Sequence, residues 1–113
     1  MTHRMTLQSE PFLMIKSRKK TIELRLYDEK RRAVSIGDEI LFTSAATGET
    51  LRCVVTDLYP FPSFSALYAS LPLLACGYTE ENVAAASPED MKRYYPREEE
   101  ERYGVLGIGI TLL

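Results

Sequence analysis

Residues 21–27 alternate strictly between polar and apolar side chains, and this pattern constrains the fold more than any other part of the chain. Ile22, Leu24 and Leu26 occupy every second position, and the residues between them are polar or charged. Side chains of a β-strand point alternately to its two faces, so the stretch predicts a strand with one face in the core. Such a strand is not stable alone, and the rest of the chain has to supply its sheet.

Further strand patterns follow on the C-terminal side. Residues 39–43 and 51–58 are rich in apolar side chains, and the stretch AATGE between them has the composition of a hairpin tip. Residues 105–113 form a last strand pattern, which Gly107 and Gly109 interrupt. Glycine inside a strand marks a bulge or the close approach of another backbone, so we expect one of these there.

Short helices are predicted between the strands. Pro11 suits the first turn of a helix that ends near Ser17. Other helical segments begin at capping residues or prolines, namely Ser63, Thr79, Ser87 and Pro96. The order of strands, then helices, then a final strand predicts an α+β fold, in which a small barrel-like sheet carries flanking short helices.

Length and composition limit the class of protein. A chain of 113 residues is long enough for one hydrophobic core, so we expect a single domain over residues 1–113. Residues 1–6 show no signal-peptide pattern, and we expect His3 to lie in a frayed end. No run approaches the roughly 18 apolar residues of a membrane span, which favours a cytoplasmic protein. Cys53 and Cys76 lack the spacing of zinc ligands, so no metal and no cofactor are expected.

Charge is distributed unevenly along the chain, although the formal net charge is only -2. Basic residues concentrate in residues 16–32, and an acidic run occupies residues 98–101. The near balance of charge argues against a broad nucleic-acid-binding surface, because such domains are usually strongly basic. A local basic patch is still compatible with a short single strand or a mononucleotide.

The polar face of the strand at residues 21–27 carries the candidate binding residues. Thr21, Glu23 and Arg25 lie on one face at intervals of about 7 Å. Arg25 presents a planar fork to a phosphate or a base edge, while Glu23 can accept a hydrogen bond from an amine or act as a base. Lysines before the strand extend the positive field, and a tyrosine at its end can stack on a base. The full candidate ligand-binding set is Lys19, Lys20, Thr21, Glu23, Arg25 and Tyr27.

The same pattern has a simpler explanation. A strand of an antiparallel sheet usually keeps one face in water. On that interpretation Glu23 and Arg25 form a surface ion pair worth less than about 1 kcal/mol. Tyr94 and Tyr95 are a further candidate for stacking on a base, although adjacent tyrosines more often divide into one buried and one exposed ring.

The chain resembles the ASCH domain family, whose members are PUA-like β-barrels. The segment SRKKTIELRLYDEKRRAVSIGDEILF, residues 17–42, is similar to the family's G-x-K-T-x-E-x-R strand and the G-D turn after it. The similarity continues through residues 58–68 and 76–110, and the second of these resembles the ending of small bacterial single-domain members. The resemblance implies a small PUA-like β-barrel with flanking short helices, and the lack of a long apolar run predicts no association with a membrane.

The resemblance also implies a cleft between the first helix and the motif strand, where the family is thought to bind RNA or nucleotides. The residues that match the family's cleft residues are Lys20, Thr21, Glu23 and Arg25. The expected partner is therefore RNA, a short single-stranded nucleic acid, a nucleotide or a nucleoside. Ser17-Arg18 stands where the family has a glycine before the lysines, which makes this turn less permissive.

Two other functions stay open. The family includes amidohydrolases that deacetylate 4-acetylcytidine with a Lys, a Thr and a Glu, and it includes ribonucleases. Lys20 matches the lysine, Glu23 occupies the position of the threonine, and the glutamate aligns near Glu80 and Glu81. The alternative is thus a metal-independent hydrolase with Lys20 and Glu23 as catalytic residues. The third is a protein-interaction domain, with the acidic segment 98–102 as its contact surface.

Overall fold

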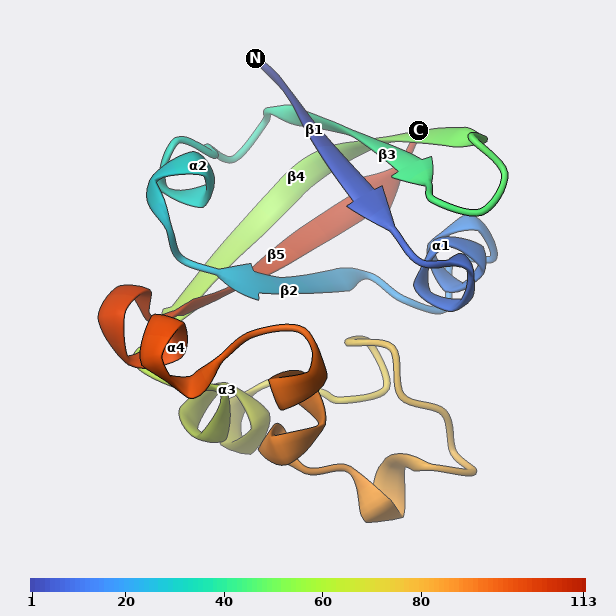
Figure 1. Ribbon diagram of the computed structural model, residues 1–113. Helices are drawn as coiled ribbons and strands as arrows, with labels where there is room; N and C mark the ends of the chain where they lie inside the picture. The colour runs from blue at the N-terminus through green and yellow to red at the C-terminus, as the bar shows by residue number, and fades with distance from the viewer.

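A strongly curled, five-stranded sheet forms the centre of the computed structural model, which describes residues 1–113 (Figure 1). Its strands are β1 (Thr2–Leu7), β2 (Ile22–Leu26), β3 (Glu39–Ser44), β4 (Thr50–Phe61) and β5 (Val105–Leu112). They are ordered β1-β3-β4-β5-β2, and every neighbouring pair is antiparallel except β1 and β3, which run parallel. Because β1 and β2 remain at the two open edges, the sheet is a half-barrel.

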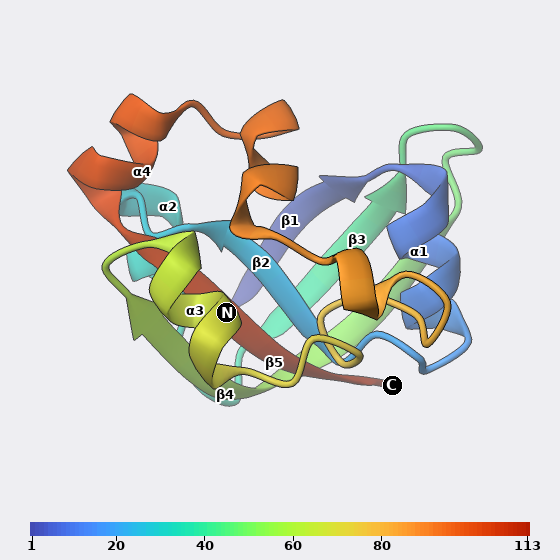
Figure 2. The same ribbon diagram turned by 90° about the horizontal axis from the view of Figure 1, so that it is seen from below.

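Short helices surround this sheet and confirm the expected α+β fold. The α-helices are α1 (Ser9–Lys16), α2 (Glu29–Arg32), α3 (Phe64–Ser70) and α4 (Arg97–Tyr103), and the 3-10 helices are η1 (Val83–Ala85) and η2 (Pro88–Arg93). Figures 1 and 2 show α1 near the start of β2 and α2 near its end. None of the helices is long and apolar enough to cross a membrane.

Four of the five predicted helix starts are found in the structure, and the first is α1, which has Pro11 in its first turn and ends at Lys16. The Ser63 hydroxyl oxygen accepts a hydrogen bond from the Ala66 backbone N–H at 3.1 Å, and Ser87 begins η2 with a capping box. Pro96 stands directly before α4. The residues after Thr79 form a turn that leads into η1, so the α-helix expected there is replaced by a shorter 3-10 helix.

Hydrophobic side chains pack on both faces of the sheet. The inner cluster lies within the curl and comprises Met5, Leu7, Phe12, Ile15, Val34, Ile40, Phe42, Cys53, Val55, Leu106, Ile108 and Ile110. The outer cluster lies beneath α3 and comprises Ile22, Leu24, Leu26, Phe64, Leu67, Cys76 and Val105. The apolar side of β2 is therefore in the core, as the alternation predicts, and it belongs to the outer cluster.

The charged residues of β2 point into the curl. Glu23 lies opposite Ile108, and Arg25 lies opposite Leu106, in the antiparallel pair with β5. Residues directly opposite one another in such a pair share a face, and both β5 residues belong to the inner cluster. A solvated face for this strand is therefore excluded, since Glu23 is only 3% exposed.

Two basic side chains, one from β2 and one from α2, reach the open edge of β1. Nη2 of Arg25 donates to the carbonyl oxygen of Thr6 at 3.0 Å, and Nζ of Lys30 donates to the carbonyl oxygen of Arg4 at 3.0 Å. Both carbonyls belong to the edge of β1 that has no neighbouring strand. The two cations thus satisfy backbone acceptors that the open sheet leaves unpaired.

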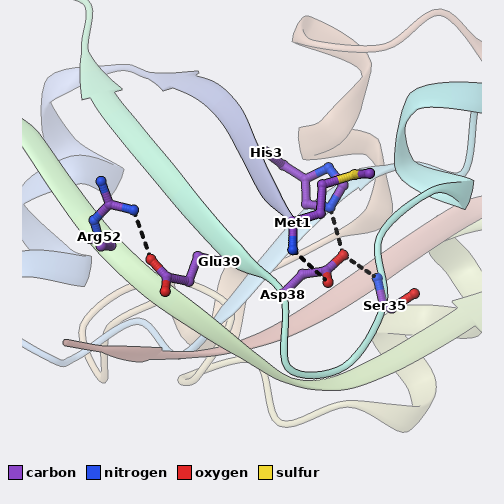
Figure 3. A network of polar contacts seen from close by, with 6 residues as sticks. All are labelled: Met1, His3, Ser35, Asp38, Glu39 and Arg52. Carbon is purple, nitrogen blue, oxygen red and sulfur yellow. Dashed lines mark hydrogen bonds and ion pairs between the residues drawn. The ribbon is translucent and has the colours of Figure 1, made fainter.

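The first residues form a strand, so the frayed end expected for them is wrong. His3, Met5 and Leu7 are buried, the residues between them are exposed, and β1 pairs in parallel with β3. His3 is 8% exposed, and its Nε2 lies 2.8 Å from Oδ2 of Asp38 (Figure 3). A histidine at an inward position masked the alternation in the sequence, and the partner strand lies far along the chain.

Asp38 is the centre of a polar network that holds β1 against the turn before β3 (Figure 3). Its Oδ2 lies within hydrogen-bonding distance of His3 and accepts from the backbone N–H of Ser35 at 3.0 Å. The bond with His3, followed by the bond from Ser35, lowers the pKa of Asp38 from 3.8 to about 2. The ionised carboxylate therefore stabilises the folded state.

Replacing this carboxylate should produce a pH-dependent loss of stability. Because the folded-state pKa is depressed, the contribution of Asp38 is complete only well above the unfolded pKa of 3.8 and disappears as the pH falls towards about 2. Asp38→Asn should thus be less stable than the wild type at neutral pH, and the difference should shrink between about pH 5 and pH 2. Urea denaturation across this range measures the difference, and a difference independent of pH contradicts the assignment.

Arg18, in the turn between α1 and β2, is the one residue other than glycine with a positive φ, at 65°. This is the turn in which the family's glycine is absent. The left-handed conformation costs a residue with a Cβ roughly 1–2 kcal/mol. The departure from glycine therefore leaves local strain at the entrance to β2.

Arg18→Gly is expected to raise the free energy of unfolding by up to about 1 kcal/mol, because relief of the strain exceeds the extra freedom of glycine in the unfolded chain. Arg18→Ala is the matched control. It removes the hydrogen bond from the arginine to the Leu112 carbonyl oxygen but keeps the Cβ. Chemical denaturation of both variants measures the effect, and equal stabilities would show that the turn is unstrained.

The glycines of β5 lie where a close approach is predicted. A Cβ added at Gly109 would lie 3.0 Å from the Cβ of Asp57, beside the register shift between Val55 and Asp57. The strand β4 is longer than expected and continues through Pro60 to Phe61. Proline is tolerated there because this end of β4 pairs only with β5, which leaves its other edge free.

Candidate ligand-binding cleft

A cleft of about 330 Å³ opens beside the charged residues of β2. Its walls are the end of β1 with α1, the middle of β2, and the segment 76–95, which contains η1 and η2. Figure 2 shows this segment crossing in front of β2, with α1 at one side. The polar residues that line the cleft include Gln8, Glu10, Lys20, Glu23, Arg25, Tyr68, Tyr78, Asn82, Asp90, Arg93, Tyr94 and Tyr95.

Glu23 stands between two cations in this cleft. Its Oε1 lies 2.8 Å from Nζ of Lys20, and its Oε2 lies 2.8 Å from Nη2 of Arg25 and accepts from Nε at 2.9 Å. The side chains of Lys20, Glu23 and Arg25 are 10%, 4% and 13% exposed. We call these three residues the ionic triad. Both carboxylate oxygens are engaged by a cation.

The environment keeps Glu23 ionised. Burial by itself raises the pKa of this carboxyl, but the charges of Lys20 and Arg25 and their hydrogen bonds lower it by more, so the pKa lies below 4.5. A carboxylate whose two oxygens both accept from cations is a weak base. In this arrangement Glu23 orients Lys20 and Arg25 toward the cleft.

Neighbouring elements hold the two cations in place. The backbone N–H of Lys20 donates to the carbonyl oxygen of Met14 in α1 at 3.1 Å. Gly77 has a φ of +112°, and a Cβ there would lie 3.3 Å from Cδ of Lys20, so the lysine stem packs on the glycine. A side chain at this position would require an unfavourable backbone conformation and would displace the stem of Lys20. Arg25 is fixed from the other side by the carbonyl of Thr6.

Two tyrosines and an aspartate form the opposite wall. The Tyr78 hydroxyl donates to Oδ2 of Asp90 at 2.6 Å, and its oxygen lies 2.8 Å from the hydroxyl of Tyr68. Burial is the largest effect that raises the pKa of Tyr78, and the bond to Asp90 raises it further. The same bond is the largest effect that lowers the pKa of Asp90. The wall therefore presents a carboxylate beside neutral phenols.

Tyr95 and Tyr94 divide into one packed and one exposed ring. Tyr95 stacks on buried Phe64 with ring centroids 5.9 Å apart. Burial raises the pKa of Tyr95, although the nearby charge of Arg25 opposes this effect. Tyr94 is 53% exposed, and the guanidinium of Arg93 lies 5.5 Å from the centre of its ring. The exposed ring is available to stack on a ligand.

The three residues of the ionic triad are the candidate residues that the structure brings together in the cleft, and the other three lie elsewhere. Lys19 is exposed on the outer side of α1. Thr21 is also exposed, and its backbone N–H donates to the Ala75 carbonyl oxygen at 2.9 Å. Tyr27 follows the end of β2, and the guanidinium of Arg32 lies 4.2 Å from the centre of its ring. None of these three lines the cleft.

The acidic residues singled out in the sequence lie outside the cleft. Glu80 and Glu81 precede η1, and the next residue, Asn82, lines the cleft instead. The acidic run forms part of α4, where Glu100 accepts from the backbone N–H of Phe64 at 2.8 Å and so caps α3. No three histidine, cysteine, aspartate or glutamate side chains gather as possible ligands for one metal ion.

Sequence reasoning missed the wall formed by Tyr68, Tyr78 and Asp90. The Ser87 cap places Asp90 in the first turn of η2, and the sequence shows this cap. The sequence does not show the contact of Tyr78 with Tyr68, ten positions before it, or with Asp90, twelve positions after it, because the segment between them is irregular. No periodic pattern signals such a contact.

The charges that line the cleft are balanced. Three cations face three carboxylates, namely Lys20, Arg25 and Arg93 with Glu10, Glu23 and Asp90. Four tyrosines lie among them. A balanced site with aromatic rings suits a planar group with polar edges better than an isolated phosphate.

Comparison with known proteins identifies the family. Residues 5–113 match the family model of the ASCH domain. The chain is similar to the hypothetical protein PH0355, with 32% identity, complete coverage of both chains and a TM-score of 0.83. It is also similar to protein PF0455 from Pyrococcus furiosus, with 34% identity, coverage of 100% of this chain and 98% of that chain, and a TM-score of 0.74.

A mutant of the ZmASCH protein from Zymomonas mobilis shares the fold at 12% identity, with a TM-score of 0.67 over 97% of this chain and 67% of that one. No curated protein matches the chain. The family match covers nearly all of the sequence, and the half-barrel with its short helices agrees with the PUA-like fold expected of the family. The chain belongs to the ASCH domain family.

Proposed function

We propose that the cleft binds a nucleoside unit, either in a nucleotide or in RNA. Proteins of the ASCH family are generally RNA-binding or hydrolase-like. The observation that carries the proposal is the buried ionic triad of Lys20, Glu23 and Arg25 in a cleft whose opposite wall contains tyrosines. The triad keeps two cations in place beside a site with the chemistry of a base-binding pocket.

The composition of the cleft matches the needs of a nucleobase. A base offers donors and acceptors on its edges and an aromatic face, and proteins read it by stacking and by hydrogen bonds. The triad supplies donors, Asp90 supplies an acceptor, and the exposed ring of Tyr94 supplies a stacking surface. A volume of about 330 Å³ lies within the usual range for small-molecule sites.

A ligand screen with a stacking variant tests this proposal. Nucleosides, nucleotides and short RNA oligomers are expected to raise the melting temperature of the wild-type protein. Tyr94→Ala should weaken binding by roughly 5- to 150-fold, since stacking on an aromatic side chain is worth about 1–3 kcal/mol per base. Lys92→Ala changes a residue of η2 that lies two positions before Tyr94 and does not line the cleft, so this variant should bind as the wild type does. If no compound stabilises the wild type, the proposal fails.

A metal-independent hydrolase is the second candidate, because an ammonium group and a carboxylate lie 2.8 Å apart and nearly buried in a ligand-sized cleft. Glu23 can take up a proton only after Lys20 or Arg25 has turned to the ligand, since both of its oxygens are engaged. Mass spectrometry of the same samples, with 4-acetylcytidine included, separates the two functions. A ligand recovered unchanged supports a binding domain, and a product that disappears with Lys20→Gln supports an enzyme.

A further inference from the structure

Three exposed cations without a carboxylate partner lie on β1 and on α2, the helix that follows β2. They are Arg4, Lys30 and Arg32, and none of them takes part in an ion pair. Lys30 and Arg32 belong to α2, and Lys30 reaches β1 through its bond to the Arg4 carbonyl oxygen. The guanidinium of Arg32 lies against the ring of Tyr27. We call these three residues the basic track.

The basic track continues directly from the cleft. On the free edge of β1, the Thr6 carbonyl accepts from Arg25, which lines the cleft, and the Arg4 carbonyl accepts from Lys30. The two carbonyls are two residues apart, which is about 7 Å along a strand. A row of basic side chains therefore leads from Arg25 in the cleft along the β1 edge to α2, and its positive charge is unpaired only beyond the cleft.

The cleft and the basic track differ in their charge. The cleft has as many carboxylates as cations. In α2 and its cap, Asp28 is paired with Arg31 at 3.1 Å, so Glu29 is the single unpaired carboxylate beside three unpaired cations. The cleft, which has equal numbers of cations and carboxylates and several aromatic rings, suits a base. The adjacent basic track suits the phosphates that follow the base along the chain.

We infer that the ligand is a single-stranded nucleic acid, with one nucleoside in the cleft and its neighbouring phosphates on Arg4, Lys30 and Arg32. This inference rests on the proposed function. A duplex would need a broader positive surface than three cations. Arg32 also donates to the carbonyl oxygen of Tyr103 at the end of α4, whose glutamates limit the track on that side. The bound nucleic acid therefore runs along the edge of β1.

The salt dependence of RNA binding tests the inference. The four labelled RNA homotetramers and the four nucleosides are titrated into the full chain at several salt concentrations. Each phosphate contact on a single strand changes the slope of log K against log salt by about 0.7. Arg4→Ala with Lys30→Ala should therefore make the slope less steep by about 1.4 and weaken tetramer binding about 25-fold at 0.1 M salt. Nucleoside binding should not change.

A second pair of substitutions provides the matched control. Lys16→Ala with Arg52→Ala removes the same charge from exposed residues, which are paired with Glu49 and Glu39 away from the track. This variant should bind tetramers as the wild type does. If Arg4→Ala with Lys30→Ala proves unstable, Arg32→Gln alone should still reduce the slope by about 0.7.

The outcomes distinguish this inference from the proposed function. If the wild type binds a nucleoside as tightly as its tetramer, or if the track variants bind the tetramer like the control, the track is not a phosphate site and the proposed function stands. If the wild type binds neither nucleosides nor tetramers, the proposed function itself fails. A loss of tetramer binding that is confined to the track variants establishes the inference.

Discussion

Glu23→Gln is expected to lower the free energy of unfolding by about 3–5 kcal/mol, because removal of one partner of a buried ion pair leaves an uncompensated charge. In this chain the loss affects two cations at once. Lys20 and Arg25 are each no more than 13% exposed, and both lie within 2.8 Å of the carboxylate. A glutamine retains one acceptor, but its amide group cannot accept from the second cation. Denaturation with urea at neutral pH measures the loss.

Glu39→Gln is the matched control for this prediction. It makes the same chemical change in an ion pair of similar length, 2.7 Å to Arg52, but these two side chains are 40% and 51% exposed. Exposed pairs contribute less than about 1 kcal/mol. If Glu23→Gln costs no more than Glu39→Gln, the triad does not stabilise the fold and its burial has another explanation.

Phe64→Ala is expected to cost about 3–5 kcal/mol of stability, as is usual when a buried phenylalanine is truncated. Phe64 is 1% exposed and lies in the outer cluster at the start of α3. Its ring also stacks on Tyr95, which lines the cleft. The substitution therefore removes core packing and, at the same time, the support of one wall of the site.

Two comparisons separate these effects. Leu13→Ala changes an apolar residue of α1 that is 57% exposed, and it should alter stability by less than about 0.5 kcal/mol. Phe64→Leu keeps most of the buried volume but loses the aromatic contact with Tyr95, which is worth about 0.5–1.5 kcal/mol. A folded Phe64→Leu protein should bind the ligand more weakly than the wild type, because Tyr95 loses the ring that holds it in the wall of the cleft. Unchanged binding would show that Tyr95 is positioned by its other neighbours.

Local patterns in the sequence were sufficient where a residue's environment depends on its near neighbours. The alternation of Ile22, Leu24 and Leu26 predicts β2 and its apolar side, because the period of a strand is a local property. The caps at Ser63 and Ser87 predict where helices begin, because a capping side chain bonds to backbone groups within three residues. The family motif added the identity of the charged residues that share the cleft.

Long-range pairing explains what local patterns could not show. β1 was missed because its partner, β3, is distant in the chain and because His3 occupies an inward position. The hydrogen bond from Tyr78 to Asp90 depends on the path of the irregular segment between them. Lys19 and Lys20 are adjacent in the sequence, yet one is exposed and the other is buried on Gly77. A single turn of the backbone decides which lysine enters the cleft.

Sequence patterns alone predict the strand that the structure shows at Ile22–Leu26 and the α+β class, and together with the family motif they supply six candidate binding residues around this strand. The selection of Lys20, Glu23 and Arg25 from these six, and the burial of all three, follow from the tertiary structure. The curl of the sheet turns the charged face of β2 inward, and the segment 76–95 covers it. The physical reason is that a strand's period decides which residues share a face but not what lies above that face. The energy of a charge depends on that surrounding medium, which distant parts of the chain supply.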